Sequence, residues 1–121
     1  MLLIDTANVL GSRPTGWWRD RAGATRLLVE RIRAASAAGE LPQPVVMVVE
    51  GAARRGVEED IADGVEVVHA SGEGDDTLVA LASAAAEPVT LVSADRGLRD
   101  RVRGPYVEVI GPRWLLDRLP Q

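Results

Sequence analysis

Acidic side chains at three places in the sequence have the types and positions to bind a metal ion together. Asp5 ends the apolar run LLID, Asp75 and Asp76 stand side by side in GDDTLVALA, and Asp95 follows the apolar run VTLVS. Each place is one where a predicted strand ends or a predicted helix begins. Because the carboxyl ends of parallel strands share one edge of a sheet, we expect the four carboxylates to converge at that edge.

A cluster of carboxylates has a well-defined chemistry. Like charges at short range repel strongly in a partly desolvated cleft, so the cluster needs a cation or must bind protons. Oxygen ligands without histidine or cysteine select hard ions, which points to Mg²⁺ or Mn²⁺. Magnesium held by carboxylates and waters commonly activates water for attack on a phosphate. The pattern therefore predicts a Mg²⁺ or Mn²⁺ site that acts on phosphate esters.

A helix cap is the alternative role for each acid. Carboxylates at a helix start accept free amide hydrogens and interact favourably with the helix dipole, which is the commoner role for Asp75 or Asp76 taken alone. Asp95 could likewise cap the following helix, with Ser93 sharing that role. Asp5 ends a buried strand and is followed by Asn8 in a predicted loop, which is a poor choice for stability alone. Taken together, the three places favour the metal site.

The elements that must position these acids follow from the apolar pattern. Five short apolar runs are typical of buried strands, at residues 2–4, 45–49, 65–68, 89–92 and 106–110. Segments with helical spacing lie at about 20–38, 57–63, 75–86, 96–102 and 112–119. The alternation predicts an α/β fold in which residues 1–121 form a single domain, a three-layer α/β/α sandwich with a mostly parallel sheet of about five strands. Residues 6–20 are predicted to be a long irregular loop, and strands 2–4 and 89–92 to be neighbours at the ligand-binding crevice.

The composition excludes several classes of function. The chain has no cysteine and a single histidine, His69, which excludes thiolate chemistry and histidine metal clusters. All 14 basic residues are arginine, so mechanisms that need a lysine are excluded as well. The net charge of −4 disfavours indiscriminate binding to nucleic acid. No apolar run approaches the roughly 20 residues that cross a bilayer, so we expect a cytoplasmic protein without membrane contact.

Arginine and tryptophan side chains near the acids in sequence are the candidates for substrate binding. Arg13 and Arg96 are the predicted contacts to a phosphate backbone, with a solvated face or salt bridges as the alternative. One of the pair Trp17 and Trp18 is expected in the core, and Trp17 is the candidate for stacking on a base of single-stranded RNA. His69 is either a general base or, more commonly for its type, a partly buried hydrogen-bonding side chain.

Three motifs occur in a fixed order between residues 4 and 101, namely IDTANVLGSRP, GDDTLVALA and LVSADRGLRDR. Together they resemble the NYN branch of the PIN-like nucleases. The resemblance implies a compact α/β/α sandwich that hydrolyses RNA with a metal ion. It implies that Asp5, Asp75, Asp76 and Asp95 are the metal-binding and catalytic acids, and that Asn8 orients Asp5 or touches substrate. Ser93, in the third motif, is predicted to contact substrate together with Asn8.

The sequence thus predicts a ribonuclease that depends on Mg²⁺ or Mn²⁺ and hydrolyses phosphodiester bonds in single-stranded RNA. Two alternatives stay open: a nonhydrolytic module that binds RNA, a nucleotide or a protein in the same crevice, and a small nucleotide phosphohydrolase. The sequence also leaves open a homodimer, a protein inhibitor or partner, and whether Glu50 or Asp100 joins the acids.

Overall fold

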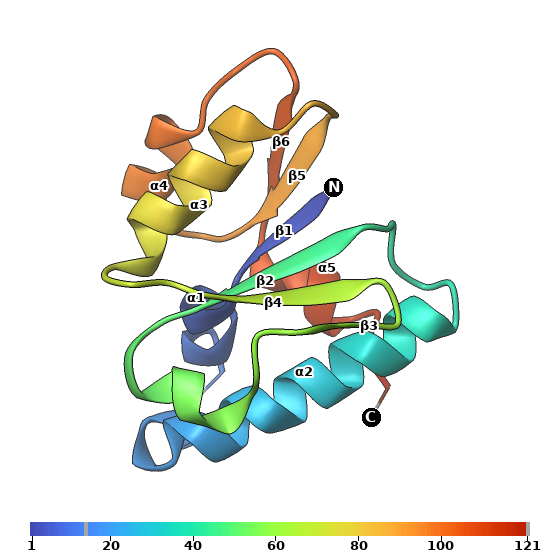
Figure 1. The fold of residues 1–121 in the computed structure, drawn as a ribbon, viewed down its shortest axis with the longest axis vertical. Coiled ribbons are helices and arrows are strands. Elements are labelled where there is room, and N and C mark those ends of the chain that lie inside the picture. The colour runs from blue at the N-terminus through green and yellow to red at the C-terminus, as the bar shows by residue number, and fades with distance from the viewer. Residues whose placement is uncertain (14, 121) are drawn as a thin grey trace.

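One six-stranded sheet organises the computed structural model, which describes residues 1–13 and 15–120. Its strands are β1 (Leu2–Asp5), β2 (Val45–Val49), β3 (Ile61–Ala62), β4 (Val65–His69), β5 (Val89–Val92) and β6 (Val107–Ile110). They lie in the order β3-β4-β2-β1-β5-β6, and every pair is parallel except β3 with β4 (Figure 1). The α-helices are α1 (Thr6–Gly11), α2 (Arg21–Ala37), α3 (Gly74–Ala84), α4 (Arg96–Arg101) and α5 (Pro112–Leu116), and two 3₁₀ helices are η1 (Trp17–Arg19) and η2 (Gly51–Gly56).

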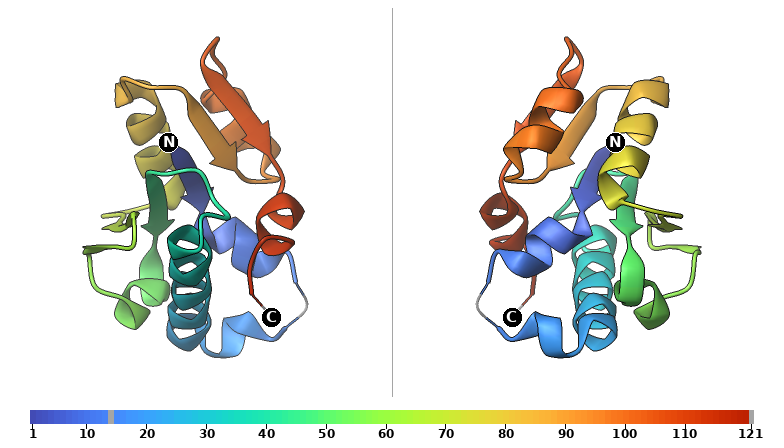
Figure 2. Two further views of the ribbon diagram at one scale, coloured as in Figure 1. Left: turned by 90° about the vertical axis from the view of Figure 1, so that its right-hand side faces the viewer. Right: turned by 90° about the vertical axis from the view of Figure 1, so that its left-hand side faces the viewer.

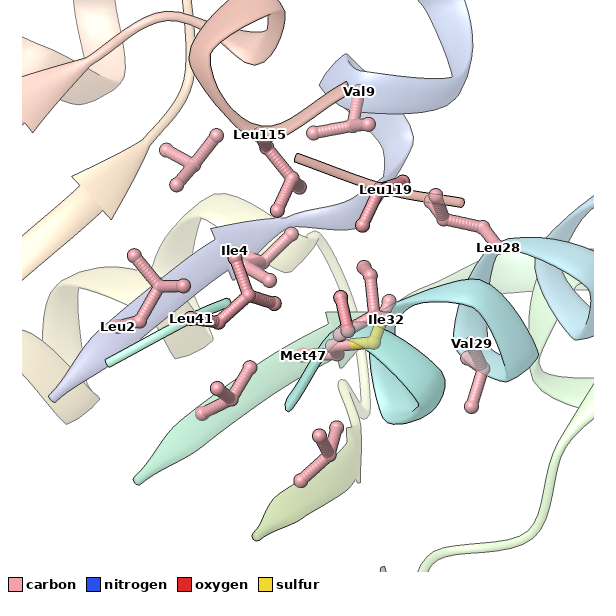
Figure 3. Close-up of a cluster of buried hydrophobic side chains, with 14 of the residues drawn as sticks. Leu2, Ile4, Val9, Leu28, Val29, Ile32, Leu41, Met47, Leu115 and Leu119 are labelled. Carbon is pink, nitrogen blue, oxygen red and sulfur yellow. The ribbon is translucent and has the colours of Figure 1, made fainter. Parts of the chain in front are cut away.

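Helices cover both faces of the sheet, which gives the predicted three-layer α/β/α sandwich (Figure 2). On one face, Leu2 and Ile4 of β1 pack in a cluster with Ile32 of α2 and Leu115 of α5, and Figure 3 shows these side chains meeting between the layers. All four are fully buried. This face is therefore closed by α1, α2 and α5.

The opposite face is covered by α3 and α4. Leu3 of β1 packs there with Leu78 of α3 and Leu98 of α4, all of them buried. Side chains alternate between the two faces along a strand. Asp5, two residues after Leu3, is therefore directed to the side of α3 and α4, where the other predicted acids lie.

Two segments differ from the sequence prediction. The predicted helix at 57–63 is wrong: the segment runs into the two-residue strand β3, which forms a hairpin with β4. Asp63 (φ 54°) and Gly64 (φ 76°) occupy the left-handed region at its turn, as two-residue hairpin turns require. The predicted loop at 6–20 is also wrong in part, because α1 and η1 form within it.

The order of strands places a crevice beside β1. The chain runs from β1 outward to β2 and β4, then returns to pair β5 with the other edge of β1. The strand order therefore reverses between β1 and β5, and ligands of open α/β sheets bind at such a point, beyond the carboxyl ends of the strands. Within the described residues, no helix combines the length and the apolar character needed to span a membrane.

Candidate functional site

Asp5 is the buried acid at the centre of the site, with only 5% of its surface exposed. Its Oδ2 accepts a hydrogen bond from Ser93 Oγ at 2.8 Å, and its Oδ1 accepts one from the amide of Asn8 at 3.3 Å. Burial raises the pKa of the Asp5 carboxyl to about 6, against the lowering effect of these two hydrogen bonds. The negative charges of Asp75 and Glu50 raise it further.

A short network ties the loop after β5 to α1. Ser93, which is fully buried, accepts a hydrogen bond from the amide of Asp95 at 3.1 Å while it donates to the carboxylate described above. Asn8 Oδ1 accepts from the amide of Ala94 at 2.8 Å. Asp95 in turn caps α4, since its Oδ1 accepts from the amide of Leu98 at 3.0 Å. These hydrogen bonds connect the motif IDTANVLGSRP to the motif LVSADRGLRDR at the crevice.

Asp75, in the first turn of α3, brings a further charge to the site. Burial raises the pKa of its carboxyl, and the charges of Asp95 and Glu50 raise it further, against the lowering effect of Arg101. Glu50, the residue after β2, accepts a hydrogen bond from the amide of Gly74 at 3.1 Å through Oε2. A Cβ atom at Gly74 would lie 2.7 Å from Glu50 Oε1, so a larger residue there would displace the Glu50 carboxylate.

Two of the candidate acids are directed elsewhere. Asp76 accepts a hydrogen bond from Arg101 Nη2 at 2.8 Å, and its side chain is 69% exposed. Asp100 pairs with Arg103 at 2.8 Å, and its side chain is 67% exposed. The structure therefore brings together Asp5, Asp75 and Asp95 of the predicted set, adds Glu50, and leaves Asp76 on a surface ion pair.

The chemistry of the four gathered carboxylates fits a divalent cation. An all-oxygen, anionic donor set suits Mg²⁺ or Mn²⁺. Burial is the main cause of the raised pKa values of Asp5 and Asp75, and neighbouring negative charges, which a cation would compensate, raise them further. Over residues 1–13 and 15–120, no three acidic or histidine side chains stand already positioned to hold one ion. Asp5 and Asp95 are engaged with Ser93 and backbone amides instead. Binding would therefore require rotation of these side chains.

Two arginines of η2 and His69, the last residue of β4, line a basic pocket that reaches Gly51, the residue after Glu50. The pocket has a volume of about 500 Å³ and is lined by Arg54, Arg55 and His69 with Gly51 and Ala52. The guanidinium of Arg54 is held by the carbonyl oxygens of Gly51 and Ala70, each at 3.2 Å. Arg54 and Arg55 lie in the segment EGAARRG, which belongs to none of the three sequence motifs.

The two arginines predicted to bind substrate lie in other grooves. Arg13 is exposed and lines a groove with Leu27 and Arg31 of α2. Arg96, also exposed, lines a groove with Arg99 that runs along α4 and β6.

His69 is a partly buried, hydrogen-bonding side chain, the commoner of the two roles expected for it. It is half-buried, and its Nε2 lies 2.8 Å from the carbonyl oxygen of Val57. Since a carbonyl oxygen only accepts, Nε2 must carry the hydrogen in this contact.

Neither Trp17 nor Trp18 lies in the hydrophobic core, so the expectation of one core tryptophan in this pair is wrong. Trp17 is half-buried, whereas Trp18 is 54% exposed, and their rings meet edge to face at 6.5 Å. The guanidinium of Arg21 lies 5.4 Å from the ring centroid of Trp17. Trp17 and Arg21 line a cavity that also contains Glu50, so the half-buried tryptophan is the one beside the acids.

Comparisons with known proteins support the architecture alone. No family model matches the sequence, and no curated protein matches it. Among solved structures, the crystal structure of a mutant of Rae1 (YacP) from Bacillus subtilis superposes with a TM-score of 0.68. The similarity covers 96% of this chain and 72% of that chain, at 20% sequence identity. At this identity the likeness establishes a shared α/β/α fold.

Proposed function

We propose that the protein is a ribonuclease that depends on Mg²⁺ or Mn²⁺. The observation that carries the proposal is the gathering of Asp5, Glu50, Asp75 and Asp95 at the carboxyl edge of a parallel sheet, where two of them have raised pKa values. The resemblance of the three sequence motifs to the NYN branch of the PIN-like nucleases supports the same activity. This assignment exchanges Asp76 of the predicted set for Glu50.

The chain's own residues have separable roles in this proposal. Asp5, Glu50, Asp75 and Asp95 would hold the cation, which supplies an activated water and offsets negative charge on the phosphate. Ser93 orients Asp5 through its 2.8 Å hydrogen bond. Asn8 acts through its backbone amide on Asp5 and through its side chain on the loop after β5, so it positions the site rather than the substrate.

RNA is the substrate class that the surroundings of the acids favour. The basic pocket of Arg54, Arg55 and His69 reaches Gly51, the residue after Glu50, and arginine forks can bind two phosphate oxygens at once. Trp17 lies on another side of Glu50 and offers a planar surface for an unpaired base. Phosphate contacts and base stacking together are typical of proteins that bind single-stranded nucleic acid.

Cleavage of short fluorescent single-stranded RNAs with Mg²⁺ or Mn²⁺ tests the proposal. We expect cleavage by the wild-type protein, its loss with chelator, and its loss in Asp5→Asn and Asp95→Asn. Asp76→Asn is the matched control, because it also removes one carboxylate but takes it from a surface ion pair with Arg101. Cleavage that survives chelation, or that persists in the Asp5 and Asp95 variants, would refute the assignment.

A nonhydrolytic RNA-binding module is the second candidate. It is favoured by the hydrogen bonds that hold Asp5 and Asp95 away from a ready-made ion site within the described part of the chain. Thermal unfolding with and without Mn²⁺ separates the two, because a ligand that binds only the folded protein at 100 times its dissociation constant stabilises it by about 2.7 kcal/mol. RNA binding without any rise in unfolding temperature on addition of Mn²⁺ would favour the second candidate.

A further inference from the structure

A small cavity adjoins the acids on the side of α1 and α2. It has a volume of about 160 Å³ and is lined by Thr6, Leu10, Trp17, Arg21, Glu50 and Gly51, among others. Glu50 belongs both to this cavity and to the acid cluster, and Thr6 directly follows Asp5 in the chain. A group bound in the cavity would therefore lie close to the phosphate that the acids are proposed to act on.

The size of the cavity suits one aromatic ring. An engineered apolar protein cavity of about 150 Å³ binds benzene, which sets the scale for a single six-membered ring. At about 160 Å³ this cavity has room for a pyrimidine base. The fused double ring of a purine would need more space.

Two planar groups in the wall are suited to stacking. The indole of Trp17 has the guanidinium of Arg21 5.4 Å from its centroid. RNA-binding proteins stack unpaired bases on aromatic rings and on arginine planes alike. The remaining wall near Leu10 is apolar, as the face of a base requires.

Polar groups in the wall suit the edge of a base. Thr6 is only 1% exposed, and its Oγ1 has no hydrogen-bond partner among the described residues. A buried hydroxyl without a partner is a costly arrangement in a folded protein. Glu50 supplies an acceptor in the same wall, and acidic side chains accept from the amino group of cytosine.

We propose that this cavity binds a single pyrimidine base of single-stranded RNA, next to the phosphate held at the acids. The proposal rests on the function proposed above, because it assumes that RNA occupies the crevice. It adds a base preference, which neither the carboxylates nor the arginines can supply. Trp17, Arg21 and Thr6 are the residues that carry it.

Binding of labelled hexamers of cytidine, uridine and adenosine, measured by fluorescence anisotropy, tests the proposal without requiring cleavage. The wild-type protein is used in chelator and again in Ca²⁺. We expect a pyrimidine hexamer to bind more tightly than the adenosine hexamer. We expect Trp17→Leu to lower its affinity by about 5- to 150-fold, the range that loss of one stacked base gives. Trp18→Leu is the matched control, because it removes an exposed indole that does not line the cavity.

Arg21→Gln and Thr6→Val guard against a folding defect in the tryptophan variant. Arg21 is exposed at the first turn of α2, and valine preserves the shape of threonine, so both variants should fold. Each is expected to weaken pyrimidine binding and leave the weaker adenosine binding nearly unchanged. Equal binding of all three hexamers, or equal losses in the Trp17 and Trp18 variants, would overturn the proposal, and so would no binding in either condition. If the hexamers bind equally, or if the Trp17 and Trp18 variants lose equal affinity, while RNA is still cleaved without sequence preference, the pyrimidine site is overturned and the ribonuclease assignment stands.

Discussion

Replacement of Asp5 by asparagine is expected to stabilise the metal-free protein at neutral pH. The folded environment raises the pKa of the Asp5 carboxyl from 3.8 to about 6, with burial as the main cause. A group whose pKa is higher in the folded state binds its proton more tightly there, so its ionisation disfavours folding. The stabilising effect of the bound proton is fully present below pH 3.8 and is lost as the pH rises through about 6.

The size of the effect follows from the shift. The pKa of Asp5 rises by about 2, and each unit of pKa corresponds to about 1.4 kcal/mol. Ionised Asp5 therefore lowers the free energy of unfolding by about 3 kcal/mol at pH 8. The asparagine side chain would carry no charge but would lose part of the hydrogen bonding to Ser93 and Asn8, at a cost of about 1 kcal/mol. The variant should therefore be about 2 kcal/mol more stable than the wild type at pH 8. At pH 4.5 this advantage should shrink by about 2 kcal/mol, because much of wild-type Asp5 is protonated there.

Urea unfolding of both proteins in chelator, at pH 8 and pH 4.5, measures this difference directly. Asp76→Asn removes the same type of group from an exposed pair with Arg101, and surface pairs contribute only about 0–1 kcal/mol. We therefore expect that control to stay within about 1 kcal/mol of the wild type at both pH values. An Asp5→Asn advantage that is absent, or that does not change between the two pH values, would refute the reasoning about a buried, repelled carboxylate.

Two further predictions concern the scaffold of the site. Gly56→Ala should lower the free energy of unfolding by about 1–3 kcal/mol or more, because the new Cβ atom would lie 2.0 Å from the carbonyl oxygen of Ala22. Gly72→Ala is the control: a Cβ atom there has nothing within 4 Å, so the same urea titration should show a change of less than about 0.5 kcal/mol. Asn8→Ala should cost about 0.5–1.5 kcal/mol through the lost bond to the amide of Ala94, and should also weaken the Mn²⁺-dependent rise in unfolding temperature; an unchanged response to Mn²⁺ would show that the bond does not position the site.

Much of the fold was predictable because the strands are short apolar runs with clear boundaries. The predicted strands at 45–49 and 89–92 match β2 and β5, and the other three differ by one residue at one end. Prediction failed where tertiary context decides the backbone. The acidic segment before β4 has helical composition but forms β3, since Asp63 and Gly64 provide a hairpin turn and β4 a partner. Helix α1 was hidden within a predicted loop because its six residues are too few for a periodic pattern.

The position of the site could be predicted from the sequence, but not which acids belong to it. Strand ends identified Asp5 and Asp95, since parallel strands bring their carboxyl ends together. Which member of the pair Asp75 and Asp76 faces the crevice depends on the rotation of α3 and on Arg101, neither of which the sequence states. Glu50 carried a usable signal, because it also follows a predicted parallel strand, but no motif supported it.

The capping and metal-binding interpretations of these acids turn out to be compatible for a physical reason. Asp5 and Asp95 both cap helices, while Asp75 lies in the first turn of α3 without capping it. In a parallel α/β sheet each strand is followed by a helix, so the amino ends of α1, α3 and α4 all meet the same edge of the sheet. Each helix start favours negative charge by about 0.3–1 kcal/mol, which offsets part of the repulsion among the carboxylates. The chain can therefore fold with this anionic edge before a cation binds. The remaining repulsion, which adds to burial in raising the pKa of Asp5, favours binding of a cation there.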